Sequence, residues 1–480
     1  MILSPRSGER QPADFPRHRS PAILSPRSGE RQQADLHRHP RPVILSPLSG
    51  ERQQADFPRH RRPVILSPRS GEHQQADFPR HRRPVILSPR SGERQPADFP
   101  RHRSLICRTL LLSLALFVPL SLSSAPAAEP IKLGEIEPLT GKEAAFGQQA
   151  HRGVLMAIAE INARGGVLGR PLAVVVEDNQ SKSGDSATVA KKLISREKIV
   201  ALLSGGTSSN CLEVAPLAEA ARIPFVATTA TAPEVTEKRA YVFRSCFIDP
   251  FQGAVLATFA TTTLRAKRVA LLTSVSASYS VGLSKVFREK LTSLGGVIPA
   301  EQKYSEGDKD FRAQLTAIKA AKVDAIAITG FYTEAALICK QARDLGLTVP
   351  IFGGDGWEAP ELIEIGGKAV EGTYYASHYS SESTAPEVRA FVKKYRARYN
   401  GETPDSMAPL AYDATFIVAE AIARAGTTDS PKLRDALAAT KNFPGVTGRT
   451  SIDAQRNATK SAVMITVQNG KPTYVETIDP

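Results

Sequence analysis

The sequence predicts an α/β fold made of two doubly wound halves. From residue 131 onward, apolar runs of strand length alternate with amphipathic runs of helix length, an order typical of parallel sheets covered by helices. The same cycle restarts at residue 268. Strand-like segments also end in turns rich in Gly, Ser and Thr, which is where open α/β sheets bind ligands.

The first half combines short apolar strands with helices that are apolar on one side. In the helix that opens at residues 140–141, Val154, Ile158 and Ile161 fall on one face, and Gly165-Gly166 ends it. Two more helices are expected at 183–196 and 212–221. The expected strands are 131–136, 172–176, 199–203, 223–227 and 242–247.

The second half repeats this order and then adds helices. Its expected strands are 268–273, 297–303, 323–329 and 349–352, and its expected helices are 281–294, 310–321 and 333–345. Three further helical stretches follow at 386–399, 409–425 and 431–439, before a closing hairpin from residue 450 to the end. Two α/β lobes are therefore expected within about 350 residues, a length that exceeds one typical core.

The first hundred residues have a different character. A 21-residue unit begins at Ile2 and recurs at Ile23, Ile44, Ile65 and Ile86. Residues 1–127 hold 21 Arg and no Lys against 10 acidic residues, so they carry +11 of the net charge of +14. Such Pro- and Arg-rich repeats with few apolar residues favour disorder. We expect residues 1–104 to be absent from the native protein, as a translated DNA repeat upstream of the true start.

Residues 105–127 have the order of a secretory signal peptide. Arg101, Arg103 and Arg108 precede an uncharged run, 109–122, which small residues follow. The run is short for a membrane span, and no Cys follows it to serve as a lipid-anchor site. We therefore expect a start near Leu105, Sec-type export to the periplasm without a lipid anchor, and a mature chain that begins near residue 128.

The remaining chain carries a net charge of only +3, which gives no reason to expect nucleic-acid binding. It holds three cysteines, so an exported protein can form at most one internal disulfide. Cys211 and Cys246 are the candidates, because both lie in the first half, whereas Cys339 does not. Two buried free thiols remain the equal alternative, since spacing says nothing about the geometry of the side chains.

Two hydroxyl-rich turns follow neighbouring strands of the first half, at 204–210 and 228–231. The carboxyl ends of parallel strands meet at one sheet edge, where free N–H groups and small hydroxyls suit a carboxylate. The alternative is that these hydroxyls only cap helices. Catalytic signatures such as G-x-S-x-G, Walker A and H-E-x-x-H do not occur after residue 127. We expect no enzyme, metal site or cofactor, and surface positions for His151 and His378.

Several ordered motifs resemble a known family. LTGKEAAFGQQAHRGVLMAIAEINARGGVLGRP, SGGTSSN, TTATAPE, SYSVGL and GGDGW are similar to segments of the Leu/Ile/Val-binding proteins of branched-chain amino acid ABC transporters. The resemblance runs from about residue 131 to the C-terminus. It implies the type I periplasmic binding fold, in which two Rossmann-like lobes are joined by a three-strand hinge. The expected N-terminal lobe is 129–249 plus 379–446, and the C-terminal lobe is 250–378 plus 447–480.

The resemblance also implies a role for individual residues. Ser208 and Thr231 would bind a ligand carboxylate, while the carbonyl of Thr229 and the side chain of Asp355 would bind its ammonium group. An apolar wall and a closing ring would come from Phe146, Tyr279, Phe331 and Trp357. Both charges of a bound amino acid need a partner in the protein, because an unpaired buried ion costs several kcal/mol.

The function that follows is capture of a small aliphatic, branched-chain amino acid and its delivery to a membrane ABC permease. The protein would act as a monomer. A sensor or regulator of amino acids or amides that uses the same fold without transport is the alternative, although the signal peptide argues against it. Asp355 also fits a simple turn between glycines, so its role depends on the shared edge and the family match.

Overall fold

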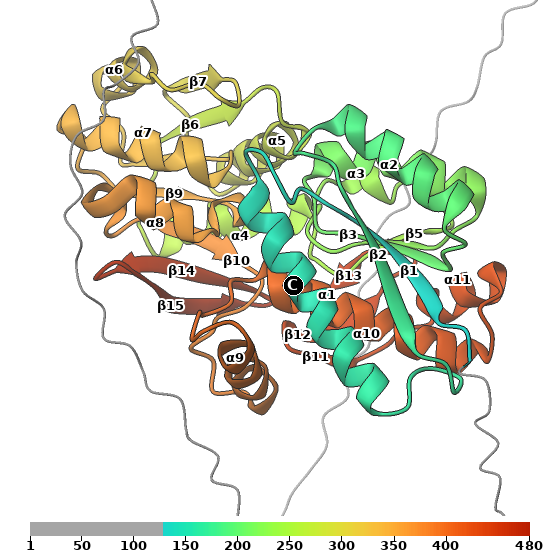
Figure 1. The fold of residues 1–480 in the computed structure, drawn as a ribbon. Coiled ribbons are helices and arrows are strands. Elements are labelled where there is room, and N and C mark those ends of the chain that lie inside the picture. The colour runs from blue at the N-terminus through green and yellow to red at the C-terminus, as the bar shows by residue number, and fades with distance from the viewer. Residues whose placement is uncertain (1–127) are drawn as a thin grey trace, which may run out of the picture. The chain divides into compact units, whose positions relative to one another are not determined.

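The computed structural model describes residues 128–480. The repeats at 1–104 and the signal peptide at 105–127 therefore lie outside the described residues. Within the part that is described, no helix is both long enough and apolar enough to cross a membrane. Up to residue 377 the elements mostly alternate between strand and helix, as the sequence pattern predicts, and three helices and then five strands follow (Figure 1).

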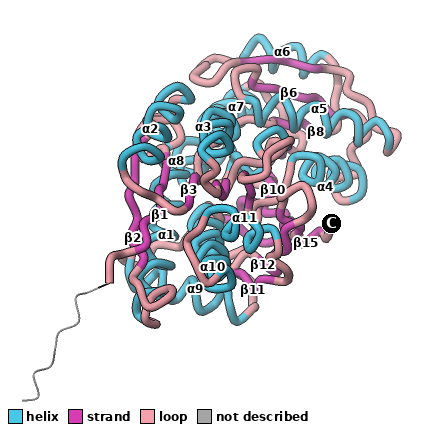
Figure 2. The backbone as a smooth tube through the Cα atoms, turned by 90° about the vertical axis from the view of Figure 1, so that its right-hand side faces the viewer, coloured by secondary structure: helices cyan, strands magenta, loops and turns pink. Residues whose placement is uncertain are grey.

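The first sheet is parallel, with the strand order β2-β1-β3-β4-β5. Figure 2 labels β1, β2 and β3 of this sheet. Its strands are β1 (Ile131–Glu137), β2 (Leu172–Asp178), β3 (Ala201–Ser204), β4 (Phe225–Ala227) and β5 (Val242–Arg244). The connecting helices are α1 (Ala144–Ala163), α2 (Ser183–Arg196) and α3 (Ser208–Ala221), and a short 3-10 turn, η1 (Pro233–Val235), follows β4. Strand β3 is buried along its whole length, as expected for a parallel strand inside a sheet.

The second sheet has the order β15-β14-β10-β9-β8-β6-β7. The parallel strands are β6 (Val269–Ser274), β7 (Glu301–Tyr304), β8 (Ala325–Ile328), β9 (Ile351–Gly353) and β10 (Tyr374–Ser377). The antiparallel hairpin of β14 (Ala462–Gln468) and β15 (Lys471–Ile478) pairs with β10 at one edge. The helical elements are α4 (Asp249–Thr262), α5 (Ser278–Ser293), α6 (Arg312–Ala320), α7 (Tyr332–Asp344), η2 (Asp355–Trp357), α8 (Pro360–Gly366) and η3 (Gly367–Val370).

The chain returns to the first sheet after β10. Helices α9 (Pro386–Arg398), α10 (Met407–Ala425) and α11 (Ser430–Ala438) follow, and α10 packs along α1 (Figure 1). The two helices touch closely at Gly153, where a Cβ atom would lie 2.0 Å from the Ala408 carbonyl oxygen. Any larger residue would therefore separate α1 from α10.

A small sheet precedes the closing hairpin. It contains β11 (Phe443–Gly445), β12 (Gly448–Ile452) and β13 (Ala458–Thr459). The predicted hairpin begins at residue 450, about twelve residues before β14. The segment from 450 to 459 instead pairs within the small sheet. This segment also contacts the first half, since Arg244 N donates to Arg456 O and Thr236 Oγ1 bonds to Asn457 Oδ1. We infer that the third crossing between the lobes lies near Lys460.

The predicted α/β fold with two mostly parallel sheets is confirmed. We infer three crossing segments, 244–249, 377–386 and 459–462, because elements on either side of each belong to different sheets.

Candidate functional site

The turn after β3 is fixed by local hydrogen bonds. Thr207 caps α3 with a reciprocal capping box, in which its hydroxyl oxygen accepts from Asn210 N and its backbone N donates to Asn210 Oδ1. Ser208 is the first residue of α3 and is buried. Its Oγ accepts a hydrogen bond of 3.2 Å from Ala232 N. The helix N-terminus and the Ser208 hydroxyl thus form one rigid group of neutral polar atoms.

The turn after β4 is bonded to the turn after β3. Thr229 Oγ1 donates to the Gly206 carbonyl oxygen at 3.0 Å, and Thr228 N donates to Ser204 O at 2.8 Å. Thr231 is buried in the same turn. The two hydroxyl-rich turns therefore come together at one sheet edge. The hydroxyls of Thr207 and Thr229 also form hydrogen bonds with backbone groups of these turns, as the capping alternative expects.

Asp355 lies in the turn after β9 and is 4% exposed. Gln252 Nε2 donates to Asp355 Oδ1 at 2.8 Å, and His378 Nε2 lies 3.0 Å from Asp355 Oδ2. Each carboxylate oxygen thus has one partner and keeps further acceptor capacity. The surface position expected for His378 is wrong, because its side chain is buried against Asp355.

Tyr279 orients Gln252 through a directional chain of hydrogen bonds. Gly356 N donates to the Tyr279 phenol oxygen at 3.2 Å, and the phenol donates to Gln252 Oε1 at 3.1 Å. The amide nitrogen of Gln252 is then left to face Asp355. Gly354 permits this approach, because a Cβ atom there would lie 2.2 Å from both Gln252 Oε1 and the phenol oxygen.

Three aromatic rings lie beside these polar groups. Phe331 stacks on Tyr279 with ring centroids 5.4 Å apart, and Phe146 meets Phe331 edge-to-face at 6.1 Å. Phe146 comes from α1 and Phe331 precedes α7, so the rings join elements of the two halves. Together they supply the apolar surface expected of a ligand site.

One cavity brings most of the predicted residues together. Its lining is Phe146, Gly206, Thr207, Ser208, Thr229, Thr231, Tyr279, Phe331, Asp355, Gly356 and Met407. Its volume is only about 20 Å³, room for roughly one water molecule. Trp357 does not reach it, because its ring is fully buried and its Nε1 donates to Ile328 O at 3.1 Å.

Two larger hollows, of about 820 and 790 Å³, lie beside α9 and the closing hairpin. Both lie along the crossing segment that begins at residue 377 and are lined by residues such as Tyr379 and Glu382. Size alone does not decide between these hollows and the smaller cavity. Only the smaller cavity collects groups from the carboxyl ends of β3, β4 and β9, the position at which such sheets bind ligands.

Contacts outside the cavity also join the two halves. Lys142 Nζ lies 2.7 Å from Glu306 Oε1, and the Tyr332 phenol donates to Lys142 O at 2.7 Å. Ser278 N donates to Ser209 Oγ at 3.2 Å. These contacts hold the loops of the two sheets together on the rim of the cavity.

Asp249 is a buried acid that the sequence analysis did not single out. It is the first residue of α4, and neither carboxylate oxygen accepts a hydrogen bond within residues 128–480. Burial raises the pKa of Asp249 to about 8, and repulsion from Asp355 adds to this rise, although the neighbouring Thr231 side chain opposes it. Asp249 is therefore largely uncharged at neutral pH.

The structure also shows the bonding and burial of the cysteines and of the other histidine. Cys211, Cys246 and Cys339 are free and buried, so the structure has the two-thiol alternative rather than the disulfide. Burial raises the pKa of each thiol to about 12. His151 is half-buried rather than on the surface, with Nδ1 2.7 Å from Glu135 Oε2. No cluster in the described part of the chain has three side chains suited to hold a metal ion.

Residues 130–472 match the family described as periplasmic binding protein. The chain belongs to this family. It is 31% identical over 332 residues to the Leu/Ile/Val-binding protein BraC3 of Rhizobium johnstonii, covering 68% of this chain and 89% of that protein. The predicted family resemblance is confirmed.

Solved structures agree with this assignment. The leucine binding protein LivK of Thermotoga maritima is 41% identical, with a TM-score of 0.70 over 73% of this chain and 99% of that one. LivJ of Streptococcus pneumoniae, solved in complex with isoleucine, is 36% identical with a TM-score of 0.70, over 73% of this chain and 100% of that one. This periplasmic binding protein is a solute-binding protein of the ABC-transporter type and not an enzyme.

Sequence reasoning missed several residues of this site. His378 follows β10, the parallel neighbour of β9, so the sheet-edge rule that selected Ser208 also applied to it. Gln252 lies inside the first turns of α4, and Met407 begins α10. No local sequence pattern marks these two positions, because their partners are far away in the chain.

Proposed function

We propose that this periplasmic binding protein captures a small aliphatic, branched-chain amino acid and delivers it to an ABC permease. The observation that carries the proposal is the pairing of unlike groups in one cavity. Neutral N–H and hydroxyl groups come from the β3 and β4 edge, one carboxylate comes from the β9 edge, and aromatic rings complete the lining. A zwitterion removed from water needs both of its charges matched in this way.

In this proposal the ligand carboxylate binds to the first sheet. Ser208 and Thr231 would each offer a hydroxyl and a backbone N–H, with the N-terminus of α3 behind them. The ammonium group would bind Asp355 and the carbonyl oxygen of Thr229. Both residues line the cavity from opposite sheets, which supports this assignment.

The ligand side chain would lie among Tyr279, Phe146 and Phe331. Neither phenylalanine offers a phenol hydroxyl, and the Tyr279 hydroxyl is already engaged by Gln252 and Gly356. The rings therefore present mostly carbon to the cavity. This apolar character favours an aliphatic side chain over a polar one.

Binding would require the lobes to separate and close again. A cavity of about 20 Å³ is too small for an amino acid. We infer hinge motion about the three crossing segments, with 129–249 plus 379–459 as one lobe and 250–378 plus 460–480 as the other. Contacts such as Lys142–Glu306 would re-form on closure.

We further propose export to the periplasm through the segment 105–127, without a lipid anchor, and a monomeric mature chain that begins near residue 128. The order of basic, apolar and small residues supports the signal peptide. N-terminal sequencing of the secreted protein tests this proposal. Peptides from the 21-residue repeats in the mature pool would contradict it.

Calorimetric titration with matched ligands tests the binding function. L-leucine, L-isoleucine and L-valine should bind in the micromolar range or tighter, about −8 kcal/mol or better. 4-Methylpentanoate lacks the ammonium group and isoamylamine lacks the carboxylate, so both should bind at least about a hundredfold more weakly than leucine. Preferential binding of benzoate or 4-methylpentanoate would refute the amino-acid assignment. Uptake that persists without the protein would favour a sensor.

A further inference from the structure

His378 directly follows β10 and stands at the same sheet edge as Asp355. Strand β10 pairs in parallel with β9, which leads into the turn that carries Asp355. His378 Nε2 lies 3.0 Å from Asp355 Oδ2. The ring of His378 stacks on Phe247, with centroids 3.8 Å apart and an angle of 25° between the planes. The imidazole is therefore held in one orientation against the carboxylate.

The partners of the two ring nitrogens define the protonation state. A carboxylate oxygen accepts hydrogen bonds, so Nε2 of His378 carries the hydrogen that points at Asp355. Nδ1 is buried, and the described residues offer it no hydrogen-bond partner. A second proton on Nδ1 would be a buried donor without an acceptor, which is unfavourable. The surroundings thus favour the neutral imidazole with its hydrogen on Nε2.

The charged groups around His378 act in both directions. Asp355 favours an imidazolium, whereas Lys460, from the link between β13 and β14, disfavours a second positive charge. Burial has the largest effect, and the pKa of His378 is lowered as a result. The nearby Cys246 and Asp249 are uncharged near pH 7, because burial raises their pKa values to about 12 and about 8.

The protonation state of His378 controls how much negative charge Asp355 presents to the cavity. Neutral His378 and the Gln252 amide each occupy one acceptor position of the carboxylate and leave its charge intact. An imidazolium would neutralise Asp355 and would place a buried cation beside the substrate ammonium. The same carboxylate cannot fully satisfy two buried cations.

We propose that neutral His378 is a positioning residue that keeps the Asp355 carboxylate available to a substrate ammonium group, so that protonation of His378 releases the amino acid. This inference rests on the proposed function and adds a pH response to it. Binding would expel the proton from His378, and affinity would fall as the pH drops through the pKa of His378 in the ligand-free protein. By linkage, each pH unit within this window is worth a factor of up to about ten in affinity.

Titrations of L-leucine into the full chain between pH 7.5 and pH 5.0 test the inference. We expect wild-type affinity to stay level down to about pH 6.5, because the pKa of His378 is lowered from this value, and to fall below it more steeply than the affinity of His378→Gln. His378→Gln keeps a neutral donor close to the position of Nε2, so its affinity should change less than about threefold over the same range. His378→Phe removes the donor but keeps a ring against Phe247, and it should bind about tenfold more weakly at pH 7.5.

His151→Gln is the matched control. It removes the other histidine of residues 128–480, which bonds to Glu135 and does not line the cavity. It should follow the wild-type pH profile. Thermal melts of each variant identify loss of folding. If the wild-type protein binds leucine but His378→Gln has the same pH profile as the wild type, this inference is overturned and the proposed function stands. If the wild-type protein binds no amino acid, both are overturned.

A second measurement does not depend on a ligand. Nitrogen NMR of histidine-labelled wild-type protein separates the neutral tautomers from the imidazolium, and the difference from His378→Gln assigns the signal. We expect an Nε2-protonated, neutral ring at pH 7.5. A doubly protonated His378 at that pH would overturn the inference.

Discussion

The two sides of the cavity differ in what holds their polar groups. On the β3 and β4 side, hydroxyl and N–H groups are neutral and bond to one another within and between two adjacent turns, as in the Thr207–Asn210 capping box and the bond from Ala232 N to Ser208 Oγ. On the β9 and β10 side, a buried carboxylate is held by Gln252, 103 residues away, and by His378 on the next strand. One side is built from two adjacent turns with neutral groups, and the other from contacts around a charge.

This difference has physical consequences. Neutral dipoles lose little when one member is removed, because neighbouring N–H groups remain in place. A buried charge depends on every partner, and its protonation equilibria respond to burial. Mutation and pH should therefore affect the carboxylate side of the cavity more than the hydroxyl side.

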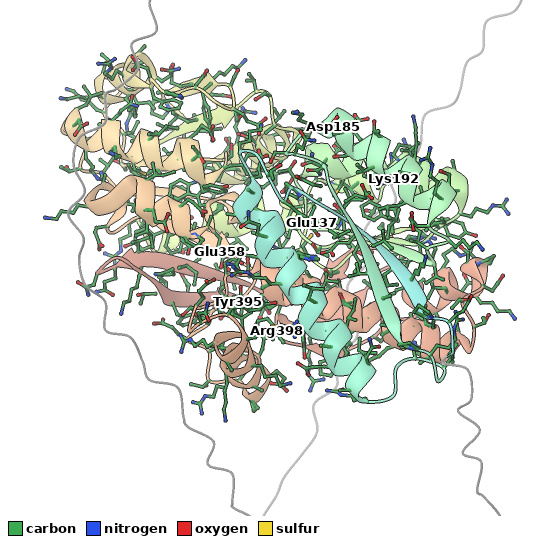
Figure 3. All side chains as sticks on the ribbon, in the orientation of Figure 1. Glu137, Asp185, Lys192, Glu358, Tyr395 and Arg398 are labelled. Atoms are coloured by element: carbon green, nitrogen blue, oxygen red, sulfur yellow. The ribbon has the colours of Figure 1, made fainter. Side chains whose placement is uncertain are left out.

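Removal of Asp355 should have the largest effect on binding. Asp355→Ala leaves a substrate ammonium unpaired and should weaken leucine binding by about 2–5 kcal/mol, as measured by calorimetric titration. The matched control is Asp185→Ala, which removes a carboxylate on the exposed face of α2 (Figure 3) and should leave affinity unchanged. If Asp355→Ala binds leucine within about threefold of the wild-type affinity, Asp355 does not pair with the ligand ammonium group.

Stability should fall as pH rises, because of Asp249. Its pKa is about 8 in the folded state and near the ordinary value of 3.8 when unfolded, so the folded state binds the extra proton between these values. The free energy of unfolding should therefore drop by about 2–4 kcal/mol from pH 5 to pH 8. Urea denaturation at pH 5, 6.5 and 8 measures this slope.

Asp249→Asn should flatten this pH dependence without abolishing it. Glu143 and Glu358, whose pKa values burial raises to about 7, contribute a slope of the same sign (Glu358 is labelled in Figure 3). An unchanged slope in Asp249→Asn would show that Asp249 is ionised in the folded protein at neutral pH. The hydroxyl side offers no comparable titrating group in the cavity lining.

Loss of the Ser208 hydroxyl should have a smaller effect than loss of Asp355. Ser208→Ala leaves the backbone N–H groups of α3 in place and should weaken leucine binding by about 1–2 kcal/mol. It also removes the acceptor of Ala232 N, so a modest decrease in melting temperature is expected. Ser195→Ala, an exposed position on α2, is the control. A loss as large as that of Asp355→Ala would contradict the distinction between the two sides.

The same contrast explains what the sequence can predict. The strand and helix order was predictable because buried strands and one-sided helices have distinct periods. The positions of Ser208 and Thr231 in the cavity lining were predictable because each lies in the turn that follows a short apolar strand. Gln252 was not, because an interior helix position becomes functional only when the chain folds back after 103 residues. His378 was overlooked, although it follows a strand at the same edge as Asp355.

The smallest effect is expected at the rim of the cavity, where neither side touches the ligand. Lys142 Nζ and Glu306 Oε1 are 2.7 Å apart, and their side chains are 44% and 14% exposed. Because water reaches the ammonium partner, the ion pair contributes little, and Glu306→Gln should weaken leucine binding by less than about 1 kcal/mol. Because screening acts on exposed charges, this difference should shrink further in about 0.5 M salt. Glu237→Gln, which breaks the exposed Lys238–Glu237 pair on the first half, is the matched control and should not alter affinity. A loss in Glu306→Gln that exceeded about 2 kcal/mol and persisted in salt would mean that closure depends on the rim as much as on the charged side of the cavity.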